Sequence, residues 1–519
     1  MKLFKKLESL LPYLLAIAGG GILPLSLAPF NYEIAAFLAP AILLFCLSQA
    51  SAKKSFLLGW CFGLGLFGFG ISWIYVSIHD YGPTPMPLAI IMTSVFTFCI
   101  ALFPAFMSYI VVKLFPNNNF QRCVLAFPVI WVLFDILRGW AFTGLPWLYI
   151  GYSQLGTNLS ALAPLGGIWL VSWATVLTAS VLYCIFDYIY ENKQIPLLRN
   201  SLILILILLW GGVTYIHKTF TWTDRKGPAL NVSLVQGNIP QLLRWDPQEV
   251  SNTIKKYQDL TSLDLKSSVK PDLIVWPESA IPIPLPASED LIKEMDVSLK
   301  QYHASLITGV PVQTQDAGGS TAYYNALISI GEGSGFYFKQ QLVPFGEYIP
   351  FEKWLRGMIN FFNVPMSSFL SAQDNPIPLL AKNLKIAPAI CYEIAYPNLV
   401  RKTLQSGPTY TLADLIITVS NDTWFGNSIG PNQHLEIAQF RALETGRYVL
   451  RAANTGLTAI ITPTGAIQSI APQFETFVLK DVVWAMDKAT PWVQYGMGPL
   501  LGSFGVLLLL AWMPIKRKK

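Results

Sequence analysis

Eight apolar runs constrain this chain more than any other feature of its sequence. They cover roughly residues 9–30, 34–50, 55–78, 87–114, 123–138, 167–188, 201–217 and 494–513. A helix needs about 20 apolar residues to cross the hydrocarbon core of a bilayer, so most of the runs are long enough and two are borderline. Only 13% of the residues are charged, against about 25% in an ordinary soluble domain. We therefore expect a membrane protein with eight transmembrane helices.

The basic residues predict how these helices are oriented. Three lysines precede the first run, two more separate the second run from the third, and four basic residues end the chain, whereas residues 79–86 contain none. Loops on the cytoplasmic side are enriched in Lys and Arg. We expect a cytoplasmic N-terminus, a first run that is retained as a helix rather than cleaved as a signal peptide, and residues 218–493 in the periplasm of a bacterial inner membrane. Because the basic excess follows the membrane segments, a nucleic-acid partner is not expected.

The organisation follows from these runs. We expect a membrane domain with seven helices over residues 1–217, one polar domain over 218–493, and the eighth helix with a basic cytoplasmic tail over 494–519. The polar domain mixes strand and helix patterns. Strands are expected at Asn231–Val235, Asp272–Trp276, Ser305–Val312, Ala326–Ile330, Gly335–Val343, Lys385–Cys391, Asp414–Ser420, Tyr448–Ala453 and Thr458–Thr462, and helices at Pro247–Leu263, Glu289–Tyr302 and Asn432–Thr445.

One cysteine of the polar domain is a candidate nucleophile. The other five cysteines lie in apolar runs, where this residue commonly behaves as a small apolar side chain. Cys391 has no second cysteine in its domain with which to form a disulfide, and it follows the apolar strand expected to end at Ile390. A buried structural thiol is the alternative. The position at the end of a strand, where α/β enzymes tend to place their sites, favours a reactive thiol.

A thiol nucleophile needs a partner, because the thiolate is the reactive form and a free cysteine is mostly protonated at neutral pH. His303 and His434 lie in helical patterns without a surrounding motif, so neither is favoured as a base. Glu278 is a better candidate, because a proline ends the apolar strand before it and presents the carboxylate there. Lys339 lies in an apolar and aromatic run, where we expect it to be buried and to stabilise a thiolate and an oxyanion.

The order of these motifs resembles a known triad. Glu278 in the sequence WPES, Lys339 before PFGEYIP, and Cys391 before Tyr392 and Glu393 resemble the Glu-Lys-Cys triad of the nitrilase superfamily. Together with the eight apolar runs and the segment Val235–Pro240, the whole chain resembles the apolipoprotein N-acyltransferase family, the membrane-bound branch of that superfamily. A nitrilase domain alone would account for the triad but not for the helices.

The resemblance implies a fold and a reaction. Residues 218–493 would form a periplasmic, nitrilase-like αββα sandwich with catalytic function beside an eight-helix membrane bundle. The acyl chain at the sn-1 position of a phospholipid would move to a thioester on Cys391, and then to the N-terminal diacylglyceryl-cysteine of an apolipoprotein, which is the last step of bacterial lipoprotein maturation. Glu278 would act as general base, and Lys339 with the backbone N–H of Tyr392 would stabilise the oxyanion.

Further residues match supporting or substrate-binding positions of the family. They are Glu347, Tyr392, Glu393 and Trp245, for which packing or surface charge is the alternative role. The segment after the Glu347 motif, residues 351–370, carries Trp354, Phe361 and Phe362 among breaks in any helical pattern. We expect a mobile lid that dips into the membrane surface, with a loop packed against the domain as the alternative.

No cofactor and no metal are expected. No His, Cys or Glu cluster has the spacing of a metal site, and the one glycine pattern that fits a dinucleotide fingerprint, Gly63-x-Gly65-x-x-Gly68, lies in an apolar run and indicates close helix packing instead. Two other functions remain open. A membrane-anchored nitrilase-type amidase would pass the thioester to water rather than to an amine, and a lipoprotein-binding scaffold would have no use for a complete triad.

Overall fold

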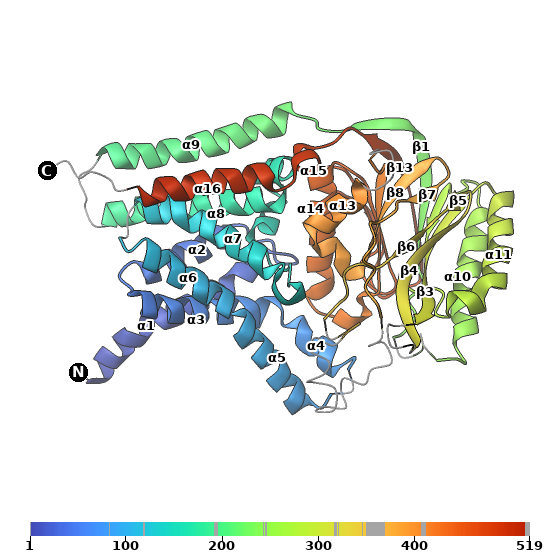
Figure 1. Ribbon diagram of the computed structural model, residues 1–519, viewed down its shortest axis with the longest axis horizontal. Coiled ribbons are helices and arrows are strands. Elements are labelled where there is room, and N and C mark those ends of the chain that lie inside the picture. Colours follow the sequence, from blue (N-terminus) through green and yellow to red (C-terminus); the bar gives the residue numbers. More distant parts are fainter. Residues whose placement is uncertain are drawn as a thin grey trace. The chain divides into compact units, whose positions relative to one another are not determined.

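The chain divides into two compact units in the computed structural model (Figure 1). Unit 1 comprises Met1–Tyr75, Pro85–Phe220 and Gln494–Lys519, and unit 2 comprises Val76–Thr84 and Thr221–Val493. The structure describes residues 2–82, 84–117, 120–190, 196–241, 243, 246–315, 319, 321–344, 346–348, 369–405 and 412–513.

Unit 1 is built from helices (Figure 1). In chain order the long ones are α1 (Lys2–Ile22), α2 (Ile34–Leu47), α3 (Ala52–Gly70), α5 (Met86–Ile100), α6 (Leu102–Leu114), α7 (Phe127–Arg138), α8 (Ala163–Tyr190), α9 (Pro196–Thr219) and α16 (Gly498–Trp512). A π-helical turn, η2 (Gln121–Ala126), leads into α7, and the short α4 (Trp73–His79) begins in unit 1 and ends in unit 2.

Four helical segments among the described residues are long and apolar enough to cross a membrane, namely Ser9–Ser26, Met86–Leu114, Asn158–Tyr190 and Arg199–Thr219. The predicted run 55–78 is broken into α3 and α4, which together make a fifth candidate with a bend of 58°. α2 and α16 are apolar but have only 14 and 15 residues. Unit 1 therefore has the helices of a membrane protein, and the count of eight crossing helices stays a prediction.

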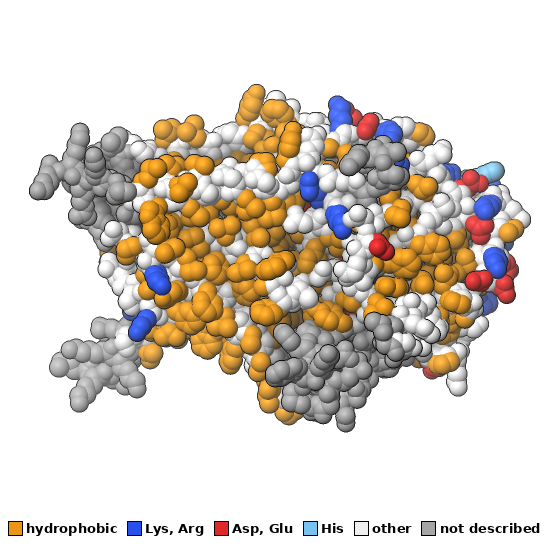
Figure 2. Space-filling view, in the orientation of Figure 1, with side chains coloured by type: hydrophobic (Ala, Val, Ile, Leu, Met, Phe, Trp, Pro, Cys, Tyr) orange, Lys and Arg blue, Asp and Glu red, His pale blue; other side chains and the backbone are white. Residues whose placement is uncertain are grey.

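The surface of unit 1 agrees with a lipid environment. On α9, Leu204, Ile207 and Leu208 are 52%, 61% and 65% exposed. Figure 2 shows hydrophobic side chains over the visible face of the unit 1 helices. An apolar surface of this extent would be strongly disfavoured in water and is normal for helices that face hydrocarbon.

Glycines set the closest helix contact in unit 1. A Cβ atom on Gly20 of α1 would lie 1.9 Å from the carbonyl oxygen of Phe62, and one on Gly65 of α3 would lie 2.0 Å from that of Ile17. No larger residue fits at either position without separating α1 from α3. Gly65 of the α3 glycine pattern thus serves helix packing, as predicted, whereas a Cβ atom on Gly68 would meet nothing within 4 Å.

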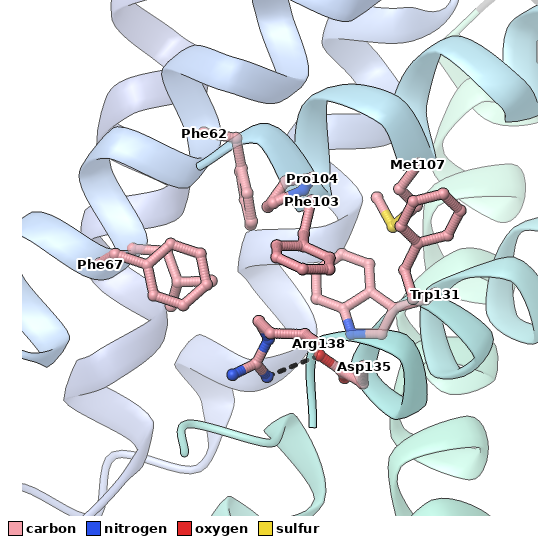
Figure 3. A pocket seen from close by; sticks show the side chains of 10 residues that line it. Phe62, Phe67, Phe103, Pro104, Met107, Trp131, Asp135 and Arg138 are labelled. Carbon is pink, nitrogen blue, oxygen red and sulfur yellow. Dashed lines mark hydrogen bonds and ion pairs between the residues drawn. The ribbon is translucent and has the colours of Figure 1, made fainter. Parts of the chain in front are cut away.

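Unit 1 also holds a small cavity lined mainly by hydrophobic side chains of α3, α6 and α7, of which five are aromatic (Figure 3). At one side of it, Arg138 Nη2 donates to Asp135 Oδ1 over 2.8 Å, and Arg138 Nη1 donates to the carbonyl oxygens of Leu145 and Trp147. These bonds tie the chain that follows α7 back to the helix. None of the predicted site residues lines this cavity.

Unit 2 contains two sheets. The first has the strand order β13-β1-β2-β3-β4-β6 and the second β12-β11-β10-β9-β8-β7-β5. The strands are β1 (Asp224–Gln236), β2 (Leu273–Val275), β3 (Ser305–Gln315), β4 (Thr321–Gly331), β5 (Gly333–Ser334), β6 (Phe336–Phe338), β7 (Leu379–Ala381), β8 (Leu384–Ile390), β9 (Leu415–Ser420), β10 (Val449–Ala453), β11 (Ala459–Ile461), β12 (Ile467–Ile470) and β13 (Phe477–Asp487).

The two sheets pack face to face with helices on their outer sides (Figure 1). Alternate residues of β2 show the layering: Leu273 and Val275 join a core shared with residues of β8 and β9, whereas Ile274 joins a second core with helix residues. α10 (Val250–Leu265) and α11 (Leu285–Gln301) cover the first sheet, and α13 (Pro397–Leu404) and α14 (Gly430–Thr445) cover the second. Unit 2 is thus the αββα sandwich that the sequence predicts.

Parallel strands at the centre of each sheet bring site residues together. β1, β2 and β3 run parallel in the first sheet, and β8, β9 and β10 in the second. Glu278 follows β2, Cys391 follows β8 and Ser420 ends β9. The carboxyl ends of parallel strands commonly form the binding crevice of an α/β fold.

Candidate active site

Glu278 is held at the end of β2 by three hydrogen-bond donors. Its Oε1 accepts from Asn325 Nδ2 over 2.7 Å and from Lys339 Nζ over 3.4 Å, and its Oε2 accepts from the backbone N–H of Asn421 over 3.0 Å. Gly309 of β3 passes so close that a Cβ atom there would lie 2.2 Å from the backbone nitrogen of Ser279. The carboxylate is therefore fixed in a buried position, 8% exposed.

Lys339 lies between two carboxylates. Its Nζ donates to Glu347 Oε1 over 2.8 Å as well as to Glu278, and the residue is 1% exposed. Burial alone would lower the pKa of Lys339, but the charges of Glu347 and Glu278 raise it above its ordinary value. Lys339 therefore stays protonated. Asn325 Nδ2 also donates to Glu347 over 3.2 Å, so one amide joins both carboxylates.

Cys391 begins the one-turn helix η7 (Cys391–Ala395) directly after β8. Its backbone adopts φ +54°, a left-handed conformation that a non-glycine residue seldom takes and that often marks a functional position. Burial and the charge of Glu278 raise the pKa of the thiol to about 12, while the charge of Lys339 lowers it. The resting sulfur is thus a thiol, and a base must take its proton when it attacks.

Glu393 fastens two segments of the site to each other. Its Oε1 accepts from the backbone N–H groups of Gln340 and Gln341 over 2.7 and 3.1 Å, and its Oε2 accepts from that of Ile390 over 2.8 Å. The hydroxyl of Tyr337 lies within 3.0 Å of both oxygens. Burial raises the pKa of Glu393 to about 7, although the hydrogen bonds from the three backbone N–H groups lower it. The carboxyl group therefore links the chain after Lys339 to the turn that presents Cys391.

Of the remaining predicted residues, the structure describes Tyr392 alone. Tyr392 is 8% exposed and packs its ring edge-on against Tyr396, with 5.2 Å between the ring centroids. Trp245 and the predicted lid residues Trp354, Phe361 and Phe362 lie outside the described residues.

Three residues of the site were missed by sequence reasoning. Asn325 stands in a strand and Asn421 after one, and neither is part of a motif that points to its contact with Glu278. His434 was set aside as a base, and its Nε2 lies 3.2 Å from the carbonyl oxygen of Cys391 rather than near the thiol proton. The one signal in the sequence was a polar residue within a mostly apolar strand for Asn325 and directly after an apolar strand for Asn421.

The described part of the chain contains no cluster of three or more His, Cys, Asp or Glu side chains arranged to hold a metal ion. The arrangement that is present, a half-buried thiol close to a fixed carboxylate and a fixed ammonium group, suits covalent catalysis by a nucleophile and a general base.

Comparisons with known proteins cover nearly the whole chain. Residues 19–181 match the family model described as apolipoprotein N-acyltransferase N-terminal domain, and residues 231–485 match that described as carbon-nitrogen hydrolase. An apolipoprotein N-acyltransferase from Azotobacter vinelandii is 41% identical over 97% of this chain and 95% of its own length, and one from Pseudomonas syringae pv. tomato is 42% identical over 96% of each. A carbon-nitrogen hydrolase structure from Helicobacter pylori aligns with 53% of this chain at 16% identity and a TM-score of 0.35.

Proposed function

The chain belongs to the apolipoprotein N-acyltransferase family, and from this premise we propose that Cys391 carries an acyl chain as a thioester between two lipid substrates. The donor is the sn-1 ester of a membrane phospholipid, and the acceptor is the α-amino group of a diacylglyceryl-cysteine at the N-terminus of an apolipoprotein. The observation that carries the proposal is the hydrogen-bonded group of Glu278, Lys339 and Glu347 beside the half-buried thiol of Cys391.

In the first step, Glu278 takes the thiol proton while the sulfur attacks the ester carbonyl carbon. The oxyanion that develops is stabilised by the ammonium group of Lys339 and by the backbone N–H of Tyr392. When the C–O bond breaks, the lysophospholipid leaves with the proton held by Glu278. The acyl chain remains on Cys391 as a thioester.

In the second step, the amine of the lipoprotein attacks the thioester carbonyl carbon and transfers a proton to Glu278. The C–S bond breaks, and the sulfur leaves as a thiolate that faces Lys339. Glu278 then returns its proton to the sulfur. Two moderate barriers replace one high barrier, which is the advantage of covalent catalysis.

Glu347 and Glu393 act as supports in this proposal. Glu347 fixes Lys339 and accepts the backbone N–H of Val343 over 2.9 Å, so it ties the lysine to the loop that follows. Glu393 holds the Cys391 turn by the bonds described above. The family resemblance supports a contact of Trp245 with substrate. The apolar and aromatic side chains of residues 351–370 support a lid in which Trp354, Phe361 and Phe362 admit the acyl chain.

The proposal includes a topology. Residues 1–217 form seven transmembrane helices, residues 218–493 form the catalytic domain in the periplasm, and residues 494–519 form the eighth helix of an inner-membrane protein. The apolar surface of α9 supports a position in the membrane, and the basic residues at positions 516–519 support this orientation.

Transfer measured with a phospholipid and a synthetic diacylglyceryl peptide tests the function. The wild-type protein should add one acyl chain to the peptide amine, and Cys391→Ala and Cys391→Ser should add none, because a serine ester is far less reactive to amines than a thioester. Release of free fatty acid with no peptide product would indicate the amidase-like reaction, in which water takes the thioester. Transfer by Cys391→Ala at the wild-type rate would refute the mechanism.

A further inference from the structure

A buried polar cluster lies behind the nucleophile and is not used by the mechanism above. Ser420 Oγ lies 3.6 Å from Cys391 Sγ and also donates a short hydrogen bond to Asp422 Oδ1. Arg451 Nη2 donates to Asp422 Oδ2 over 2.5 Å and lies 3.1 Å from His434 Nδ1. All four residues other than the cysteine are at most 2% exposed. A group of this kind is costly to bury, so its position against the reacting sulfur requires an explanation.

We propose that Ser420 is a further catalytic residue that donates a hydrogen bond to the Cys391 thiolate, and that Asp422, Arg451 and His434 are positioning residues for Ser420 and for the Cys391 backbone. This proposal rests on Cys391 being the nucleophile, as the proposed function has it.

The hydroxyl of Ser420 has one proton and two neighbours that can accept it. While Cys391 is a thiol, the sulfur is a weak acceptor, and the hydroxyl donates to Asp422. Once Glu278 has taken the thiol proton, the sulfur carries a negative charge and becomes the stronger acceptor, so the hydroxyl turns toward it. No bond other than S–H breaks in this step, and the proton resides on Glu278.

The rest of the cluster permits this turn. Asp422 keeps its ion pair with Arg451 when Ser420 leaves it, so no buried charge is left without a partner. Arg451 lies on β10 and also donates Nε to the carbonyl oxygen of Leu457 over 3.2 Å, which fixes its position. Gly456 lies so close that a Cβ atom there would be 2.3 Å from Asp422 Oδ2. Asp422 is therefore enclosed on both sides.

His434 acts on the backbone of the nucleophile. Its Nε2 lies 3.2 Å from the carbonyl oxygen of Cys391, and its Nδ1 lies close to Arg451 and to Asp422. Burial, together with Arg451, lowers the pKa of His434, so the ring is neutral at neutral pH. In the tautomer with the proton on Nε2, the ring donates to the Cys391 carbonyl, and Nδ1 accepts from Arg451 Nη2. The positive charge of Arg451 then offsets the repulsion between Nδ1 and Asp422 Oδ1, which are 3.0 Å apart. This bond holds the left-handed conformation of Cys391, which costs free energy in isolation.

The test measures the reactivity of Cys391 without any lipid. Iodoacetamide labelling of Cys391 is followed by peptide mass spectrometry over a range of pH, in wild type and in Ser420→Ala. The groups that face the sulfur are Glu278, Lys339 and Asp422, with Arg451 and His434 behind them, and all remain in the variant. Loss of a hydrogen bond to a charged sulfur should reduce the thiolate fraction about 10-fold. The greater nucleophilicity of the more basic thiolate offsets part of this, so labelling should be about 4-fold slower at each pH.

Two control variants separate this effect from a loss of structure. Ser329→Ala removes another buried hydroxyl, one that donates to the carbonyl oxygen of Leu380 over 2.6 Å, and should leave labelling unchanged. Ser420→Thr retains the hydroxyl and should restore labelling to near the wild-type rate. If Ser420→Ala does not fold, Ser420→Thr and Ser420→Val replace it as a pair of equal shape that differs in the hydroxyl alone.

Labelling of Ser420→Ala at the wild-type rate, or of Ser420→Thr at the slow rate, overturns the proposal. Because labelling requires neither donor nor acceptor lipid, it is independent of acyl transfer. A wild-type protein that forms no thioester, but whose labelling slows about 4-fold in Ser420→Ala, would refute the proposed function and support the role of Ser420.

Discussion

Lys339→Met changes the charge at the centre of the site while keeping the length of the side chain. Nζ of Lys339 lies 2.8 Å from Glu347 and 3.4 Å from Glu278, and the side chain is 1% exposed. In the variant, the two carboxylates face the same amide of Asn325 with no cation between them. The buried position leaves water little opportunity to screen their repulsion.

The expected cost follows from that burial. Removing one member of a buried ion pair typically destabilises a protein by about 3 to 5 kcal/mol, because the partner charge is left uncompensated. In a domain of this size, a loss of about 4 kcal/mol lowers the melting temperature by roughly 10 °C.

The control is a double variant that combines Lys339→Met with Glu347→Gln. The double variant removes one of the two opposed charges and keeps a side chain of the same shape, so it should recover more than half of the lost stability. Thiol acylation should remain absent in both, because neither has a cation beside the sulfur.

Thermal unfolding of the detergent-solubilised protein, followed by tryptophan fluorescence, measures the stability of the wild type and of the two variants. A Lys339→Met protein that melts within about 2 °C of wild type would contradict the burial argument. A double variant no more stable than Lys339→Met would show that the repulsion of Glu278 and Glu347 is not the cause.

Three further predictions concern neighbouring groups. Glu278→Gln should abolish acylation and yet speed iodoacetamide labelling of Cys391, because the Glu278 charge raises the pKa of the thiol; slower labelling would contradict this. Asn325→Ala should slow acylation by about 10-fold or more, since one amide bonds both carboxylates, and single-turnover mass spectrometry measures the rate. Despite its burial, the pKa of Asp422 is lowered by Arg451 and His434 from its ordinary value of 3.8. The ionised carboxylate therefore stabilises the folded state above pH 3.8, and this stabilisation is lost as the pH falls below 3.8. Melting temperatures should therefore fall more steeply below that pH in wild type than in Asp422→Asn, and equal slopes would contradict the coupling.

The strand patterns of the sequence were reliable where a strand is buried on both faces. Leu273–Val275 and the run before Cys391 are strands in the structure, because apolar side chains are needed on both sides of a central strand. The edge strand β13 (Phe477–Asp487) was missed, because Lys480 and Asp481 interrupt its apolar pattern where it faces solvent. This segment is a strand because it pairs with β1, and its own sequence pattern does not predict that pairing.

The expected strand over Gly335–Val343 is wrong in length. The structure ends β6 at Phe338, because the N–H groups of Gln340 and Gln341 donate to Glu393 instead of continuing a ladder. Lys339 is buried as predicted, although it lies just beyond the strand, and two carboxylates compensate its charge.

The sequence did not predict which side chains of distant strands contact the site residues. Motifs around Glu278, Lys339 and Cys391 marked each residue separately, and the family resemblance ordered them. Ser420 meets the thiol because β8 and β9 are neighbouring parallel strands of one sheet, whereas Asn421 meets Glu278 across the two sheets. Both are tertiary contacts between segments far apart in the chain, and no local motif predicts them.

The most direct test of the account is an intact-mass measurement of the protein after incubation with a phospholipid that carries an isotopically labelled sn-1 acyl chain. The account predicts a single labelled acyl adduct, located on the peptide that contains Cys391, which disappears when a diacylglyceryl peptide is added as the label appears on the peptide amine. A labelled peptide product formed without any adduct on Cys391, or an adduct that the peptide does not remove, would contradict it.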